Sequence, residues 1–365
     1  MKNTFGTSVA VTIFGESHGE AIGAVLDGLA PGICVDEDFI AAQLTLRRPS
    51  GKTGTARRER DPFRIVSGCF EGKTTGTPLT ILIPNENTRS RDYAATRALA
   101  RPGHADYTAY CKYHGFEDYR GGGHFSGRIT AAIVAAGAIA IAALREKGIV
   151  IGTHVSRCAG VADRPFGDLK ADIAQLSTAA FAALDAAAAE RMREKIEQAG
   201  AAGDSVGGVL ETAVLGMPAG VGEPWFDSVE SLLSHALYSI PAVQGVQFGA
   251  GFDMADAFGS EYNDSFRVAD GKIVTATNHN GGVNGGITNG MPILFRTMVK
   301  PTPSIFKTQQ TVDFFREENA ELQIAGRHDP AIIHRARVVQ DSVTALTLMD
   351  ALALRYGTDY FGGEH

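Results

Sequence analysis

Three histidines stand in turns bounded by glycine or proline, beside residues that can move a proton or hold an anion. His18 lies in "GESHG", His104 in "RPGHAD" and His328 in "GRHDP", and the last two turns also carry an arginine and an aspartate. Functional residues concentrate on loops, so these turns predict acids, bases and anion-binding groups that serve one site when the fold brings them together.

The first of these turns also spells G-x-S-x-G, the pattern of a serine nucleophile elbow. That elbow lies between a strand and a helix, behind earlier strands that help to form an oxyanion hole. Ser17 is too close to the N-terminus for such strands, and "GEAIGAVLDG" after it has a strand pattern. We therefore expect a hydrogen-bonded Ser17 in a tight turn and assign the chemistry to His18.

The chain is acidic as a whole, with a formal net charge of −7, but its arginines are locally concentrated. Seven basic residues and only two acidic ones lie between positions 47 and 64. Bidentate arginine suits carboxylates and phosphates, which favours a small polyanionic substrate. An RNA- or polyphosphate-binding protein that uses this 47–64 loop is the alternative, weakened by the near absence of stacking aromatic residues.

Residue spacing predicts neither a metal site nor export. The four cysteines form no C-x-x-C pair, and no H-x-H or H-x-x-x-H spacing occurs, so we expect no metal. The N-terminus lacks the pattern of a signal peptide, and the apolar run 131–144 is expected to be too short to cross a bilayer. A cytoplasmic location is expected.

The clearest element that could position these residues is a long buried helix after a triple glycine. "GGGHFSGRITAAIVAAGAIAIAALREKG" predicts about five helical turns, and its glycine-rich start favours an anion near the helix N-terminus. Further helices are expected within 36–48, 181–200, 227–240 and 341–357. Strands are expected within 8–15, 21–32, 63–70, 78–85, 207–216, 272–277 and 292–300. No linker or repeat divides the chain, so one domain over 1–365 is expected.

The motifs of the chain, taken in order, resemble those of the chorismate synthase family. They are "FGESHG", "RRPSG", "RPGHADY", "DYRGGGHFSGR", "GGVNGGITNG", "KPTPS" and "GRHDP". The resemblance implies a lyase of the shikimate pathway that eliminates phosphate from 5-enolpyruvylshikimate-3-phosphate, in a 1,4-anti sense, to give chorismate. It also implies reduced FMN as cofactor, NADPH only as a reductant, and a protein that supplies orientation, electrostatics and proton placement.

The same resemblance implies roles for individual residues. His18 is expected to protonate the departing phosphate, His104 to stabilise the reduced flavin, and Asp329 to help remove the C6 proton. Substrate anions are expected at Arg48, Arg101 and Arg128. FMN contacts are expected at His124, Phe125, Ser126, Pro241, Ala242, Gly285, Lys300, Pro301, Thr302, Pro303, Ser304 and Arg327.

The chain departs from the family pattern at the expected cofactor loop, where "GGGRSSARET" is common and this sequence has "GGGHFSGRIT". His124, Phe125 and Ile129 replace Arg, Ser and Glu, and Pro241 stands where Asn is usual. Because Phe125 cannot donate a side-chain hydrogen bond and Pro241 has no N–H, we expect altered flavin affinity with activity retained.

Family members imply an α+β fold: a β-α-β sandwich in which helices pack between two antiparallel four-stranded sheets, in a single domain. They also imply a homotetramer. No separate reductase domain is visible in the sequence, so a separate flavin reductase is expected to supply the reduced flavin.

Overall fold

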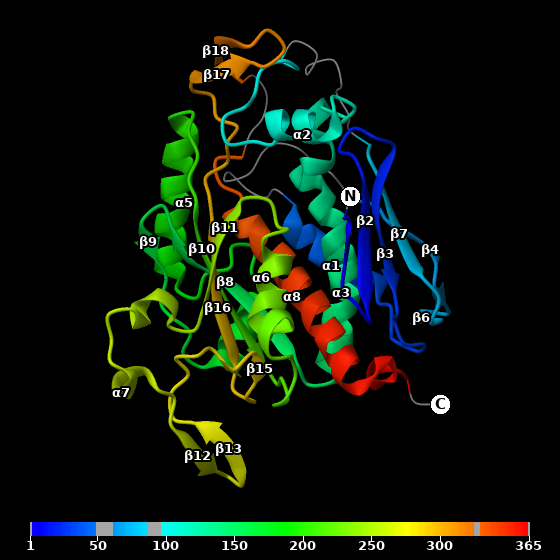
Figure 1. Ribbon diagram of the computed structural model, residues 1–365, viewed down its shortest axis with the longest axis vertical. Helices are drawn as coiled ribbons and strands as arrows, with labels where there is room; N and C mark the ends of the chain where they lie inside the picture. Colours follow the sequence, from blue (N-terminus) through cyan, green and yellow to red (C-terminus); the bar gives the residue numbers. More distant parts are fainter. Residues whose placement is uncertain (1, 49–60, 87–95, 325–328, 364–365) are drawn as a thin grey trace.

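The computed structural model describes residues 2–48, 61–86, 96–324 and 329–363 of the 365-residue chain. Two antiparallel sheets of five strands each enclose a layer of helices (Figure 1). The first sheet has the order β1 (Thr4–Phe5), β2 (Ala10–Gly15), β3 (Ala21–Asp27), β7 (Leu79–Pro84), β4 (Arg64–Ser67). The second has the order β11 (Val243–Phe248), β16 (Ile293–Val299), β10 (Gly208–Leu215), β8 (Val150–Cys158), β9 (Val161–Ala162).

The expected count of four strands in each sheet therefore needs a correction. Each sheet has four longer strands and one edge strand of two residues, β1 in the first and β9 in the second. Both short strands pair with the end of a longer neighbour. Sequence periodicity cannot detect a strand of two residues, because no alternation is visible over that length.

The helices between the sheets are α1 (Glu37–Arg47), α3 (Thr130–Glu146) and α8 (Ile333–Tyr356). Helix α3 contacts β3 and β7 of the first sheet, and α8 contacts β8 and β10 of the second. The two helices approach closely at Gly137, where a Cβ would lie 2.3 Å from Cβ of Ser342. Small residues on α3 therefore allow two helices to share one layer, and one hydrophobic cluster includes both sheets and these helices.

Helix α3 has the composition of a membrane span but lies in the protein core. The segment Gly127–Glu146 has a mean hydropathy of 1.9 and is long enough to cross a bilayer, and 89% of it is buried inside the fold. The helical segment extends beyond the apolar run 131–144 at both ends, so its burial rather than its length distinguishes it from a membrane span. Its apolar surface is covered by protein on all sides.

The last helix carries an unusual share of buried polar residues. Gln340 bonds Thr212 of β10 (2.7 Å) and Thr297 of β16 (2.5 Å) through its side-chain amide. Near the other end, the Asp350 carboxylate accepts the backbone N–H groups of residues 7, 8 and 9 at 3.0, 2.7 and 2.8 Å. The C-terminal helix is thus tied to the second sheet and to the start of β2.

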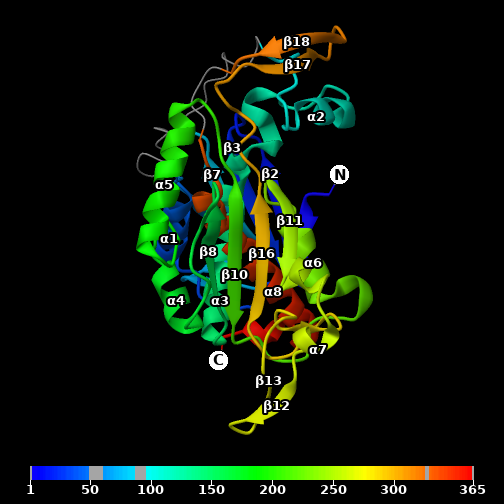
Figure 2. The same cartoon turned by 90° about the vertical axis from the view of Figure 1, so that its left-hand side faces the viewer.

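Smaller elements lie at the two ends of the sandwich. Figure 2 shows the hairpin β17–β18 (Gln309–Asp313 and Glu318–Leu322) with α2 (Asp106–Tyr113) at one end, and the hairpin β12–β13 (Phe266–Ala269 and Lys272–Thr275) projecting at the other. The remaining elements are β5 (Cys69–Phe70), β6 (Lys73–Thr74), α4 (Leu169–Leu176), α5 (Ala186–Ala201), α6 (Val229–Leu237), α7 (Gly259–Tyr262), β14 (Val283–Asn284) and β15 (Ile287–Thr288).

Candidate active site

A triple-glycine turn ahead of α3 lies where two of the expected catalytic histidines meet. Gly121, Gly122 and Gly123 have φ values of +60°, +85° and +54°, a conformation that L side chains rarely adopt. A Cβ on Gly121 would lie 2.3 Å from Cε1 of His18, and one on Gly122 would lie 3.3 Å from Cε1 of His104. The turn therefore brings two histidines from distant parts of the chain together, and it has no room for a side chain at Gly121.

His18 stands in the turn between β2 and β3, and its neighbour Ser17 fixes that turn. The backbone N–H of Ser17 donates to the carbonyl of Gly123 at 3.1 Å. Its buried hydroxyl lies 3.1 and 3.2 Å from the carbonyl oxygens of Arg120 and Gly121, and 3.2 Å from Nδ1 of His18. The prediction of a hydrogen-bonded Ser17 in a tight turn, followed by a strand, is confirmed.

His104 lies at the start of α2 in a compact arrangement with Arg101 and Asp106. Nδ1 of His104 lies 3.0 Å from Oδ1 of Asp106, and Arg101 donates to the same carboxylate through Nε (2.8 Å), Nη2 (2.6 Å) and its backbone N–H (3.0 Å). Burial raises the pKa of Asp106, but the hydrogen bonds from Arg101 and His104 outweigh it and hold the pKa well below its ordinary value. When Nδ1 donates to Asp106, Nε2 is the ring nitrogen left facing Gly122.

Arg101 therefore has a second task besides the anion binding expected from the sequence. Nε and Nη2 of its guanidinium are engaged by Asp106, and Nη2 also lies 3.0 Å from Nδ1 of His104. Its position fixes the carboxylate that orients the imidazole.

Two of the expected cofactor stretches meet beside the same histidine turn. Lys300 donates through Nζ to the carbonyl of Gly103 (2.7 Å) and through its backbone N–H to the carbonyl of Ala242 (2.9 Å). Pro303 lies 3.5 Å from where a Cβ of Gly103 would be. Thr302 has a buried hydroxyl with no hydrogen-bond partner among the residues that the structure describes. The stretches 241–242 and 300–304 thus form one side of the His104 turn.

The third cofactor stretch carries the departures noted in the sequence. Nδ1 of His124 lies 2.7 Å from the carbonyl oxygen of Gly15 at the end of β2, so this ring nitrogen donates. Phe125 is 38% exposed and meets the ring of Tyr113 edge-on, with centroids 6.1 Å apart. Ser126 accepts the backbone N–H of residue 128 at 3.3 Å. His124 therefore anchors the loop, while Phe125 leaves part of an aromatic surface exposed.

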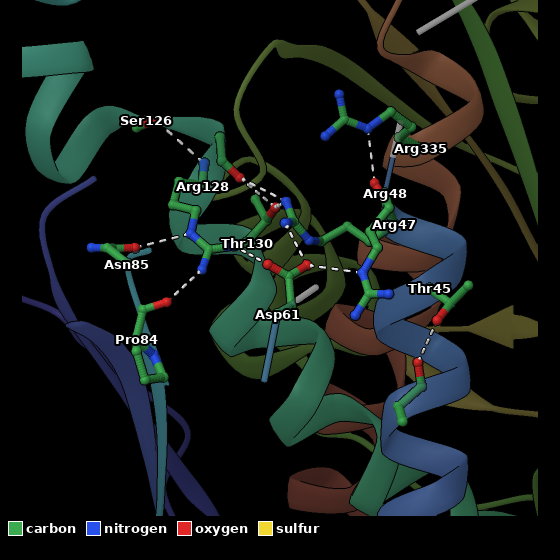
Figure 3. A network of polar contacts seen from close by, with 12 residues as sticks. Thr45, Arg47, Arg48, Asp61, Pro84, Asn85, Ser126, Arg128, Thr130 and Arg335 are labelled. Carbon is green, nitrogen blue, oxygen red and sulfur yellow. Dashed lines mark hydrogen bonds and ion pairs between the residues drawn. The ribbon is translucent and has the colours of Figure 1, made fainter. Parts of the chain in front are cut away.

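Next to this loop, a buried carboxylate binds arginines from two elements (Figure 3). Oδ2 of Asp61 lies 3.1 Å from Nη2 of Arg47 and 3.5 Å from Nε of Arg48, and Oδ1 bonds Nη1 of Arg128. Burial raises the pKa of Asp61, but the charges of Arg47 and Arg128 and their hydrogen bonds lower it further than burial raises it. Burial lowers the pKa of Arg47 to about 10, so this arginine stays charged at neutral pH.

The expected catalytic Asp329 is linked to the same cluster. Its carboxylate pairs with the guanidinium of Arg335, whose Nε donates to the backbone carbonyl of Arg47 at 2.8 Å. Arg128 is held further by Oδ1 of Asn85 (3.0 Å). Acid and arginine side chains from four separate segments therefore converge near the triple glycine.

The structure does not bring every expected residue to this place. Gly285 lies in the turn between β14 and β15, and Gly281 just before that hairpin accepts the backbone N–H of Leu294 at the start of β16 (3.2 Å). Lys300 follows the other end of that strand, which at about 3.4 Å per residue is roughly 20 Å away. Arg327 and the His328 turn lie outside the described residues, as does most of the basic 47–64 segment.

Sequence reasoning missed Asp61 and Arg335 as members of the site. Asp61 stands in "RRERDPF", where an acid among arginines suggests only a local counter-charge. Its 0% side-chain exposure and its three arginine partners come from tertiary packing. The available signal for Arg335 was only its position a few residues after the "RHDP" motif.

Comparison with known proteins points to one family. The family model described as chorismate synthase matches residues 9–353. A protein named chorismate synthase from Chitinophaga pinensis is 46% identical over 352 residues, covering 96% of this chain and 97% of that protein. Its namesake from Thermococcus kodakarensis is 42% identical over 353 residues, with coverage of 96% and 97%.

A solved structure described as a crystal structure of chorismate synthase has the same fold. Its TM-score is 0.74 at 27% identity, and the match covers 96% of this chain and 94% of that one. Because the family model, the relatives and the solved structure each extend over nearly the whole chain, this protein belongs to the chorismate synthase family.

Proposed function

We propose that this protein eliminates phosphate from 5-enolpyruvylshikimate-3-phosphate to give chorismate at the site described above, with reduced FMN as cofactor. Membership of the family makes it a lyase of the shikimate pathway. The observation that supports this location is the meeting of His18 and His104 at the triple glycine, on the segment that also carries Arg128. This part of the structure combines groups that can transfer protons with groups that can bind anions.

His18 acts in this proposal as the proton donor to the departing phosphate. The turn that carries it is fixed by the hydrogen bonds of Ser17, and Gly121 packs directly on the ring. The Asp118 carboxylate lies near enough for the charge of His18 to contribute to lowering the pKa of that carboxyl, after the larger effect of its hydrogen bond with Arg120. A fixed imidazole beside an acid is suited to deliver a proton to one position.

His104 acts as the group beside the flavin. Asp106 accepts from Nδ1 and is itself held by Arg101, so the ring orientation is set before any ligand binds. This is the arrangement by which carboxylates orient histidines in other active sites. Asp329, held by Arg335, is the group proposed to assist removal of the C6 proton.

The residues around His104 fit a flavin phosphate cofactor. The buried hydroxyl of Thr302 lacks a partner within the described chain, and Lys300 brings a cation to the same turn. FMN would contact His124 to Ser126, Pro241-Ala242, Lys300 to Ser304 and Arg327. Reduced FMN, when bound, supplies electron density to the allylic system of the substrate. The exposed face of Phe125 offers a flat apolar surface where family members have a hydroxyl.

The proposal extends to assembly and location: a homotetramer of single-domain subunits in the cytoplasm, with NADPH serving only as the reductant of a separate flavin reductase. The hairpin β12–β13 supports a contact between subunits, because it projects from the sandwich (Figure 1) and exposes Phe266, Val268 and Ile273 by 63%, 76% and 72%. Gly285, distant from Lys300 within one chain, would serve FMN only through such an assembly.

An anaerobic phosphate-release assay with 5-enolpyruvylshikimate-3-phosphate tests the function. Dithionite-reduced FMN should support turnover, and NADPH with oxidised FMN should not unless a reductase is added. No phosphate release with reduced FMN would refute the proposal. The alternative of an RNA- or polyphosphate-binding protein has no support from the relatives, and Arg47 at the start of that segment is 4% exposed.

A further inference from the structure

The side chain of Asp61 is completely buried although it is a carboxylate at the edge of a strongly basic segment. Its side-chain exposure is 0%, and guanidinium groups of three arginines contact it. Arg47 and Arg48 reach it from the end of α1, and Arg128 reaches it from the short turn Gly127–Ile129 that leads into α3 (Figure 3). One acid thus connects two elements that have no other ion pair between them among the described residues.

Asp61 is a single carboxylate that faces three guanidinium groups. Buried groups of like charge repel one another and are poorly oriented unless a counter-ion lies between them. Asp61 therefore reduces the repulsion among the arginines and fixes their arrangement around it.

The contacts show which end of each arginine Asp61 holds. It faces Nε of Arg48, the end of the guanidinium nearest the side-chain stem. The terminal nitrogens of Arg48 have no hydrogen-bond partner within the described residues, and its side chain is 27% exposed. Nε of Arg48 has no hydrogen-bond partner within the described residues, so its contact with Asp61 at 3.5 Å is an ion pair that keeps this edge of the guanidinium toward the carboxylate. The two terminal nitrogens are then left for bidentate binding of a carboxylate or phosphate.

We propose that Asp61 is a positioning residue for the reaction: together with the enclosed Arg128, whose side chain is 4% exposed, it sets the orientation in which the partly exposed Arg48 binds an anionic group of the substrate. This inference rests on the proposed function. The opposite interpretation, in which Asp61 occupies the place of a substrate anion and competes with it, is less consistent with the contact to Nε of Arg48 and with the complete burial of the carboxylate.

The test is the substitution Asp61→Asn, with Asp61→Glu as the conservative variant. Asparagine keeps the size and also tolerates the left-handed conformation of residue 61, which has a φ of +47°. The control is Asp172→Asn, which removes another largely buried carboxylate with an arginine partner, Arg164, on the outer side of the second sheet. Circular dichroism and melting temperature establish which variants fold.

We expect Asp61→Asn to raise KM for 5-enolpyruvylshikimate-3-phosphate about tenfold to a hundredfold while kcat falls by less than about threefold, since binding rather than proton transfer is affected. Asp61→Glu should recover part of the loss, and Asp172→Asn should leave KM unchanged. An unchanged or lower KM in folded Asp61→Asn would overturn the proposal, and so would a loss confined to kcat.

A second measurement separates this inference from the proposed function. Inorganic phosphate should raise the melting temperature of the wild-type protein more than that of Asp61→Asn, whether or not turnover occurs. If the wild-type protein shows no turnover, the proposed function is refuted, but the role of Asp61 in anion binding is not. Equal stabilisation of both proteins by phosphate refutes the role of Asp61, and does so even if the wild-type enzyme is active.

Discussion

The contact between Gly121 and His18 predicts a large effect from adding one methyl group. In Gly121→Ala the new Cβ would lie 2.3 Å from Cε1 and 2.5 Å from Nδ1 of His18, and 3.0 Å from Oγ of Ser17. Carbon atoms in contact are normally 3.5 to 4.0 Å apart, so the imidazole must move by roughly 1 Å or more. A displacement of about 1 Å in a catalytic group costs on the order of a hundredfold in rate, which is the fall in kcat that we expect.

The left-handed backbone at Gly121 has its own cost, which a matched variant isolates. Alanine in this conformation costs about 1–2 kcal/mol. Gly148 has a φ of +76°, close to the +60° of Gly121, and an added Cβ there meets nothing within 4 Å. Gly148→Ala should therefore show a similar loss of stability with wild-type kcat.

The assay is anaerobic phosphate release with reduced FMN, together with urea unfolding of both variants. The ratio of kcat between Gly148→Ala and Gly121→Ala measures the displacement of His18 alone, because the backbone cost is common to both. A folded Gly121→Ala protein with kcat within about threefold of wild type would refute the argument that this turn positions His18.

Three further predictions concern other groups. Asp106→Asn should lower the free energy of unfolding by about 1–3 kcal/mol at pH 7. Because the folded pKa of Asp106 is lowered, the stabilisation that its carboxylate provides is present above about pH 4 and is lost as pH falls through the folded pKa. Urea unfolding should therefore give the wild type and the variant similar stabilities in acid. His154 is buried between Asp163 and Glu211; burial lowers its pKa, but their hydrogen bonds raise it further. The stabilisation that protonated His154 provides is therefore complete below about pH 6.5 and is lost as pH rises through the folded pKa. The free energy of unfolding of His154→Gln should be about 3 kcal/mol below that of the wild type at pH 6, and this difference should be smaller at pH 9. Thr302→Val should leave the melting temperature of the free protein unchanged or higher, since it removes an unpaired buried hydroxyl, while fluorescence titration shows weaker FMN binding.

The sequence predicted the elements whose apolar pattern is simple. The helix after the triple glycine is confirmed as α3, since an unbroken run of Ala, Ile and Val is buried all round. The strands expected within 63–70 and 78–85 are also confirmed, as β4 and β7, which pair with each other in an antiparallel sense. Strand β8 was missed because "VIGTHVSRC" mixes glycine, threonine and histidine, and its buried polar residues find partners only after folding.

The start of α8 was missed for the same physical reason. The expected helix covered 341–357, whereas α8 begins at Ile333. Residues 333–340 include a histidine, two arginines and a glutamine, a composition that is typical of a solvent-exposed segment. Gln340 is nevertheless fully buried, because Thr212 and Thr297 satisfy its amide. Local patterns carry no information about such distant partners.

For the candidate site, residue types in turns singled out candidate side chains but could not predict how they meet. His18 and His104 could be singled out because each stands in a glycine-flanked turn, yet their common contact with the triple glycine depends on the packing of β2, α2 and α3. Asp61 shows this limit of sequence-based prediction most clearly. Its sequence context suggests a solvated acid, whereas in the structure its carboxylate is completely buried among arginine side chains.

The bond between Asp350 and the start of β2 has a consequence for synthesis on the ribosome. It joins residues up to 343 positions apart, so the N–H groups of residues 7–9 find this partner only when residue 350 has emerged. Contacts of such long sequence separation slow folding. The strand that leads to His18 therefore gains its last support only after residue 350 has emerged, and nascent chains must remain soluble until then with the first sheet still incomplete.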